Sequence, residues 1–120
     1  MTTDSIQQEL QQAVLDFTLG DYQVALEKLD RVIFNDLECF DAHLAKAEVL
    51  YAMQQYERAL AAAEEAEKIE SDDAHLKTSL SRIWMRLGNK KKAEAYGAEA
   101  KMLSWKKELL QGEHPDPSSL

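Results

Sequence analysis

The apolar residues of this chain recur at the spacing of amphipathic helices. One stripe has members three or four positions apart: Tyr22, Ala25, Leu26, Leu29, Val32 and Ile33. A second stripe of the same form holds Tyr56, Ala59, Leu60, Ala63, Ala66 and Ile69. A weaker third consists of Ala93, Tyr96, Gly97, Ala100 and Leu103. Because such spacing places each set on one face of an α-helix, the pattern predicts an all-α chain.

One further helical segment precedes each stripe, so six helices of similar length are expected. They cover 5–18, 21–35, 40–53, 55–69, 73–87 and 89–102. Ser104 suits the N-cap of a short final helix over 105–111. We expect 112–120, which contains both prolines, to be a flexible C-terminal tail.

The same short motif returns every 34 residues. Positions at this interval hold Gly20, Gln54 and Gly88, then Tyr22, Tyr56 and Lys90, then Ala25, Ala59 and Ala93. Three cycles, 6–39, 40–73 and 74–107, cover 102 of the 120 residues. The glycines suit the positive φ that often ends a helix, and Asp21 and Asn89 are good N-caps. Gln54 is the exception, and we expect its turn to be strained or differently closed.

A helical chain with a 34-residue period resembles the tetratricopeptide repeat (TPR) family. The period and the second helix of each cycle carry the resemblance. It implies three stacked helical hairpins in a right-handed α-solenoid, whose first helices line a concave peptide-binding groove. It also implies a capping element, and the short helix 105–111 could supply it through Trp105, Leu109 and Leu110. The chain departs from the family pattern at the position of the repeat proline, where it has Leu37, Ser71 and Trp105.

Composition narrows the class of protein further. The length of 120 residues suits one domain of 1–111, and the scarcity of Gly (4) and Pro (2) favours helices. The single cysteine, Cys39, excludes an intrachain disulfide, and no apolar run approaches the roughly 20 residues that span a bilayer. We therefore expect a cytoplasmic protein without membrane association.

Charge is unevenly spread along the chain. The net charge is −8, with 17 Asp and Glu against 5 Lys and Arg in residues 1–73, but 5 against 9 in residues 74–120. The acidic majority argues against nucleic-acid binding. The basic last third leaves an acidic protein partner possible.

The resemblance assigns a set of groove-facing residues from the first helix of each repeat. They are Leu10, Val14, Phe17, Asp41, Leu44, Glu48, Tyr51, His75, Arg82, Met85 and Arg86. Some family members hold a partner's terminal carboxylate with Lys, Asn and Arg, but Leu10 and Val14 stand at the corresponding positions and cannot donate hydrogen bonds. Two alternatives remain open. If the first turn is one residue short, Leu10, Ala13, Val14 and Phe17 face the core instead, and Leu44 and Tyr51 fit the core as well as the groove.

Lys90, Lys91 and Lys92 form a candidate basic patch at the start of the last 34-residue cycle's second helix. Positive charge at a helix N-terminus is unfavourable by a few tenths of a kcal/mol, and a broken local rule can mark function. The hypothesis is a docking patch for an acidic partner or for the acidic half of this protein. The alternative is a solvated run of charges without a role.

No residue pattern indicates catalysis or metal binding. The sequence contains no nucleophile elbow, no glycine-rich phosphate loop and no HExxH. The histidines and Cys39 do not have metal-ligand spacing, and Cys39 is expected to be a small packed residue. We expect no enzyme, no metal and no cofactor.

Three functions fit these observations. The first is a protein-binding adaptor that displays a preformed groove to a peptide or helix of a partner. The second is a small acidic secretion-type chaperone that holds a client segment, a class that this chain resembles in size and charge. The third is a structural scaffold that self-associates into a homo-oligomer.

Overall fold

The computed structural model describes residues 2–112. Within them the chain forms α-helices and no strand. The helices are α1 (Thr3–Thr18), α2 (Tyr22–Asn35), α3 (Phe40–Ala52), α4 (Tyr56–Ile69), α5 (Ala74–Arg86) and α6 (Lys90–Gln111). The predicted all-α class is confirmed, and the bounds of α1 to α5 agree with the predicted ones to within two residues. The predicted tail, except Gly112, lies outside the described residues.

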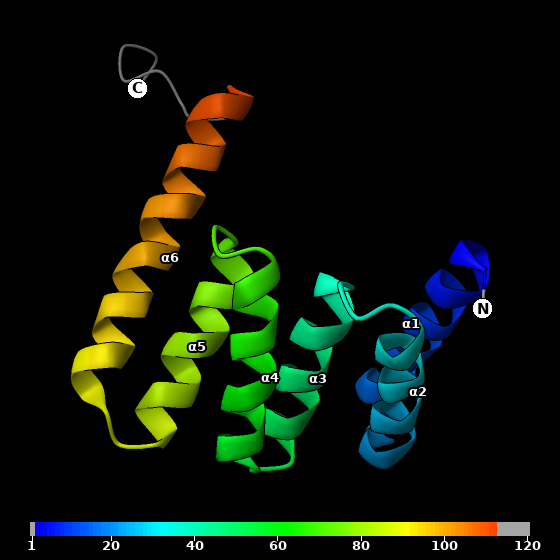
Figure 1. The fold of residues 1–120 in the computed structure, drawn as a ribbon. Coiled ribbons are helices and arrows are strands. Elements are labelled where there is room, and N and C mark those ends of the chain that lie inside the picture. The colour runs from blue at the N-terminus through cyan, green and yellow to red at the C-terminus, as the bar shows by residue number, and fades with distance from the viewer. Residues whose placement is uncertain (1, 113–120) are drawn as a thin grey trace.

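Consecutive helices pair into three hairpins, α1–α2, α3–α4 and α5–α6, which stand side by side in chain order (Figure 1). α3 packs on α2, and α5 packs on α4, so each hairpin contacts the next. The result is an elongated body of 50 × 37 × 27 Å. The three-repeat stack expected from the 34-residue period is therefore present. Within residues 2–112, no helix is both long and apolar enough to cross a membrane.

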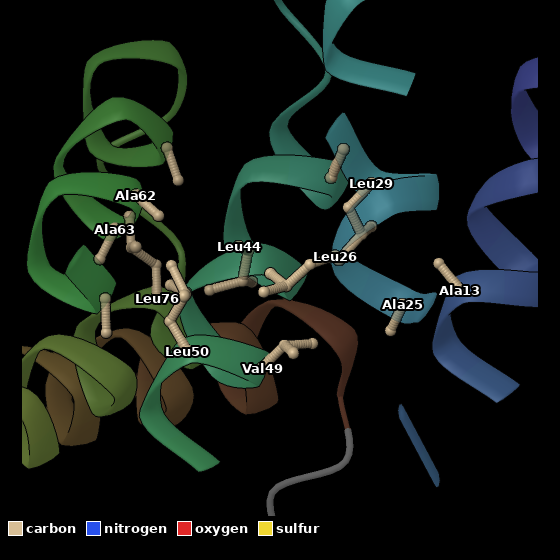
Figure 2. Close-up of a cluster of buried hydrophobic side chains, with 14 of the residues drawn as sticks. Ala13, Ala25, Leu26, Leu29, Leu44, Val49, Leu50, Ala62, Ala63 and Leu76 are labelled. Carbon is tan, nitrogen blue, oxygen red and sulfur yellow. The ribbon is translucent and has the colours of Figure 1, made fainter. Parts of the chain in front are cut away.

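Alanine at the repeated positions allows the helices to approach closely. Ala25, Ala59 and Ala93 are at most 1% exposed. Leucines fill the space between hairpins, as Figure 2 shows for Leu29, Leu50 and Leu76. Burial of each such side chain contributes about 1.5–3 kcal/mol, so stacking is the main source of stability.

Side-chain caps start three of the helices. The Oγ1 of Thr2 accepts from the N–H of Ser5 at 3.1 Å, and a carboxylate oxygen of Asp73 accepts from the N–H of Leu76 at 2.8 Å. Asn89 caps α6 by accepting from the N–H of Lys92 at 3.0 Å, as predicted. Asp21 occupies the N-cap position of α2, but its side chain makes no such bond, so the predicted side-chain cap is wrong there. The backbone turn, rather than the side chain, begins α2.

The turns inside the three hairpins share one backbone geometry. Gly20, Gln54 and Gly88 have φ angles of 86°, 63° and 84°. In each turn, the residue after the one with positive φ donates its backbone N–H to the backbone carbonyl five residues earlier. These hydrogen bonds, of 2.8–2.9 Å, run from Asp21 to Asp16, from Gln55 to Leu50 and from Asn89 to Trp84. The turn at Gln54 therefore closes like the other two, and of the two expected outcomes it is strain that occurs. The predicted strain is present, because Gln54 adopts the left-handed conformation that a side chain disfavours.

Replacing Gln54 by glycine should therefore stabilise the protein. We expect Gln54→Gly to raise the free energy of unfolding by about 0.5 kcal/mol, since relief of strain outweighs the added freedom of the unfolded chain. Urea unfolding followed by circular dichroism measures this. The reciprocal variant is Gly20→Ala, whose new methyl group would meet nothing within 4 Å. Its free energy of unfolding should fall by about 1 kcal/mol. If both variants are as stable as the natural protein, this explanation is contradicted.

The last helix differs from the prediction. α6 is one continuous helix of 22 residues that passes through Ser104, because no glycine or proline interrupts 98–111. Gly112, with φ of 70°, ends it. The segment 105–111 is helical as expected, but it is not a separate element. It also does not cover the end of the last repeat, since Trp105, Leu109 and Leu110 are exposed to 52%, 48% and 79%.

Lys77 is a nearly buried cation that ties three helices together. Its Nζ lies 3.0 Å from Glu67 of α4 and 3.1 Å from Glu99 of α6, and 5.2 Å from the centre of the Tyr96 ring. Burial lowers the pKa of Lys77, but the hydrogen bonds and charges of the two carboxylates outweigh it. The net effect raises the pKa of Lys77 above 10.5.

Removing this cation should destabilise the stack. We expect Lys77→Met to lower the free energy of unfolding by about 1–2 kcal/mol at neutral pH, a value reduced because Glu99 is half-exposed. Since the folded pKa is raised, the stabilisation is present below about pH 10.5 and is lost as the pH rises through the folded value. The stability difference between the two proteins should therefore shrink in alkaline buffer. A difference that stays constant there would contradict an electrostatic origin, and Lys91→Met serves as control.

Candidate functional site

The first helices of the three hairpins share one side of the molecule, and a pocket of about 160 Å³ opens among them. α1 contributes one residue, whereas α3 and α5 contribute four each. The lining consists of Phe17, Ala47, Glu48, Tyr51, Ala52, His75, Ser79, Arg82 and Ile83. This is the groove side that the TPR resemblance predicts. Its floor is apolar and its rim carries charged and hydrogen-bonding groups.

A close contact between a histidine and a carboxylate joins α3 and α5 across the pocket. The Nε2 of His75 lies 2.6 Å from a carboxylate oxygen of Glu48. His75 is exposed and Glu48 is half-buried, so water and a ligand can both reach the pair. A protonated His75 would neutralise Glu48, and a neutral ring can still donate one hydrogen bond to it.

Two tyrosines and an arginine form a second cluster at one end of the pocket. The rings of Tyr51 and Tyr56 lie 5.4 Å apart. The guanidinium of Arg86 lies 6.0 Å and 5.9 Å from the centres of these rings, and its Nε donates to the Tyr51 hydroxyl at 3.2 Å. The hydrogen bond to Tyr51 raises the pKa of Arg86 above its already high ordinary value. The cluster thus holds a permanent positive charge beside the pocket while leaving most of its donors free.

The structure brings together five of the predicted groove residues: Phe17, Glu48, Tyr51, His75 and Arg82. Arg86 stands next to them through Tyr51. Asp41, Met85 and Val14 are exposed but do not line the pocket. Contact of these three residues with a ligand stays a prediction.

Leu10 and Leu44 do not face the groove, and their prediction as groove residues is wrong. They are only 7% and 8% exposed and belong to the apolar core. The alternative of a core-facing α1 is correct for Leu10 and for Ala13, which is 0% exposed. It fails for Val14, which is 48% exposed. In the middle of α1, the buried face packs toward α2. Only Phe17, near the C-terminal end of α1, lines the pocket.

Sequence reasoning missed Ser79 and the apolar floor. Ser79 follows His75 by four residues and precedes Ile83 by four, so the three share one helix face. That spacing was the available signal. The rotation of α5 about its axis decides which face meets the groove, and it depends on packing against α3 and α4.

The basic patch lies outside the pocket, at the turn between α5 and α6. Lys92 places its Nζ 4.2 Å above the Trp84 ring, and Lys90 lies 3.9 Å from Glu94. These contacts partly offset the unfavourable position of positive charge at the helix N-terminus. These contacts give Lys90 and Lys92 a local structural role, and docking of a partner on Lys90, Lys91 and Lys92 stays a prediction.

Cys39 and the histidines do not form a metal site in the part of the chain that the structure describes, which contains no cluster of three candidate ligands. Cys39 is half-buried against the core at the start of α3, as expected. Its burial raises the pKa of the thiol, so it is a weak nucleophile at neutral pH. The buried His43 bonds through Nε2 to the Leu37 carbonyl at 3.0 Å. Both residues therefore have structural explanations.

Solved structures similar to this chain are helical-repeat proteins. The type III secretion translocator chaperone SycD of Yersinia enterocolitica matches with a TM-score of 0.81 and 20% identity, over 85% of this chain and 77% of SycD. PcrH in complex with the chaperone-binding region of PopD matches with a TM-score of 0.81 and 16% identity, over 86% and 77%. MamA matches with a TM-score of 0.78 and 20% identity, over 85% and 60%. At these identities the likeness shows the fold.

A search of the curated proteins finds no match. The family model of the tetratricopeptide repeat, however, matches residues 10–74 and again 44–106. Together these spans cover most of the chain, including all three hairpin turns, the whole of α3 and α5 and the second half of α1. With the 34-residue period and the stacked hairpins, they show that this chain belongs to the tetratricopeptide repeat family.

Proposed function

We propose that this protein is a non-enzymatic binding module whose groove between α1, α3 and α5 takes a segment of a partner protein. The observation that carries the proposal is the pocket shared by these three helices. Its volume of about 160 Å³ is below the roughly 300–1,000 Å³ typical of small-molecule sites. It fits one side chain of a longer ligand rather than a whole metabolite.

The chemistry of the pocket indicates which segment fits. An apolar side chain of the ligand would contact Ile83 and Phe17. This contact would exclude water from the floor of the pocket. Arg82 on the rim and Arg86 beside Tyr51 offer donors to a carboxylate or to backbone carbonyls of the ligand. An extended or helical segment with an apolar anchor flanked by acidic residues satisfies both.

A secretion-type chaperone is the second candidate. SycD has been solved with a peptide of the translocator YopD, and PcrH with the chaperone-binding regions of PopD and PopB. These neighbours share the fold of this chain, and its pocket would suit a client segment of an analogous kind. On this proposal the protein keeps an aggregation-prone segment covered in the cytoplasm, without catalysis and without contact with nucleic acid or membrane.

Substitutions in the groove should weaken binding without unfolding the protein. Peptides selected from a displayed library on the natural protein should bind Tyr51→Ala and Arg82→Glu at least about 10-fold more weakly, because each variant removes a hot-spot type of contact. Titration calorimetry measures the affinities. Lys91→Glu is the matched control, since it also reverses an exposed charge but lies outside the pocket.

Two results would contradict this assignment. One is an affinity of Arg82→Glu equal to that of the natural protein for every selected peptide. The other is an equal loss in Lys91→Glu, which would move the site to the basic patch. Insolubility of a co-expressed client in the absence of this protein, cured by its presence, separates the chaperone from a general adaptor.

A further inference from the structure

The outer face of α6 carries an apolar stripe with heptad spacing. Its members are separated by three, four, three and four residues: Ala95, Ala98, Met102, Trp105 and Leu109. All five are exposed, Met102 to 64%, Trp105 to 52% and Leu109 to 48%. Alternating spacings of three and four are the pattern of the a and d positions of a coiled coil.

The fold of the single chain uses this stripe little: only Trp105 lies beside α5, where it lines an open hollow with Thr78, Ser81 and Arg82. α6 packs on α5 through Ala93 and Ala100, which are buried. At 100° per residue, Met102 and Leu109 lie on the opposite side of the helix from that contact. α6 has 22 residues whereas α2 and α4 have 14 each, and its extra length projects past α5 (Figure 1). A large tryptophan on a projecting helix is then left half-exposed.

The charges that flank the stripe select an orientation for a second helix. At the e and g positions of this heptad stand Glu94, Glu99, Lys101, Lys106 and Glu108. In a parallel pair, g and e positions meet, so Glu94 would face Glu99 and Lys101 would face Lys106, which is repulsive. In an antiparallel pair, e meets e and g meets g. Glu99 then faces Lys106, and Lys101 faces Glu108.

We propose that two copies of this protein pair through the outer faces of α6. The two helices run antiparallel, and the two-fold axis crosses them at the level between Leu103 and Ser104. In this register Met102 of each copy lies against Trp105 of the other, and Ala98 lies against Leu109. A small residue opposite a large one fits closely packed layers. In the same register, Glu99 and Lys106 of opposite copies lie at similar positions along the paired helices, and so do Lys101 and Glu108. Because the two-fold axis repeats every contact, each of these ion pairs forms twice.

The flanking charges are available for such a contact. Within residues 2–112, Lys101, Lys106 and Glu108 make no ion pair. Glu99 contacts Lys77 but is half-exposed and can accept a second bond. The seam from Ala98 to Leu109 is short, about 17 Å at 1.5 Å per residue. It lies at the small end of specific interfaces, so the dimer is weak and depends on concentration.

Analytical ultracentrifugation of the full chain over about 1–500 µM tests the pairing. The natural protein should shift from monomer to dimer as concentration rises. Leu109→Glu places a charge against Ala98 of the second copy and should weaken the dimer more than about 10-fold. Leu110→Glu is the matched control, because the neighbouring leucine is 79% exposed but lies off the stripe. It should dimerise like the natural protein.

Charge reversal tests the orientation. Lys101→Glu should weaken an antiparallel dimer about 3- to 10-fold at low salt, since the introduced carboxylate would face Glu108 of the other copy at two places. The double variant Lys101→Glu with Glu108→Lys should restore it. A parallel dimer would instead be strengthened by Lys101→Glu, because the new carboxylate would meet Lys106.

Three results would overturn the proposal: a natural protein that stays monomeric throughout, equal loss in Leu109→Glu and Leu110→Glu, or a dimer strengthened by Lys101→Glu. Leu109 lines neither the groove pocket nor the hollow that Trp105 shares with Arg82. Leu109→Glu should therefore bind groove peptides like the natural protein, and failure of one proposal leaves the other standing.

Discussion

Burial of apolar side chains between successive hairpins is the interaction on which this structure depends. Leu29, Leu50 and Leu76 come from three different repeats, and each is at most 1% exposed. A single hairpin has no second layer to cover its apolar face, so each hairpin completes its core with its neighbour. Alanines at the 34-residue interval set how closely the helices approach, and this distance fixes the spacing of the groove walls.

The groove is a consequence of the same packing. α3 is the central element, because one face supplies Leu50 to the core while another presents Glu48 and Tyr51 to the pocket. A ligand in the pocket contacts side chains whose positions are already set by the stack. Little ordering is therefore required of the protein on binding, which favours affinity. The hydrogen bond between Arg86 and Tyr51 and the contact of His75 with Glu48 hold α3 and α5 in register.

The fold could be predicted from the sequence because small residues and turn residues mark each repeat. Gly20 and Gly88 predicted the turn geometry, and the same register located the unusual Gln54. The groove was only partly predictable. Phe17 and Tyr51 were found, but Leu10 is buried because the rotation of α1 depends on contacts with α2 that no local pattern encodes. The sequence predicted a separate helix beginning after Ser104, whereas α6 is continuous. Serine is found both at helix starts and inside helices, so Ser104 alone does not distinguish the two cases.

Backbone amide hydrogen exchange with and without a groove-selected peptide tests the central claim most directly. If the stacked hairpins present a preformed groove, the peptide should slow exchange in α3 and α5 around Tyr51 and Arg82, with little change in α2 and α4. Protection confined to α2, α4 or the outer face of α6, with α3 and α5 unchanged, would contradict that claim.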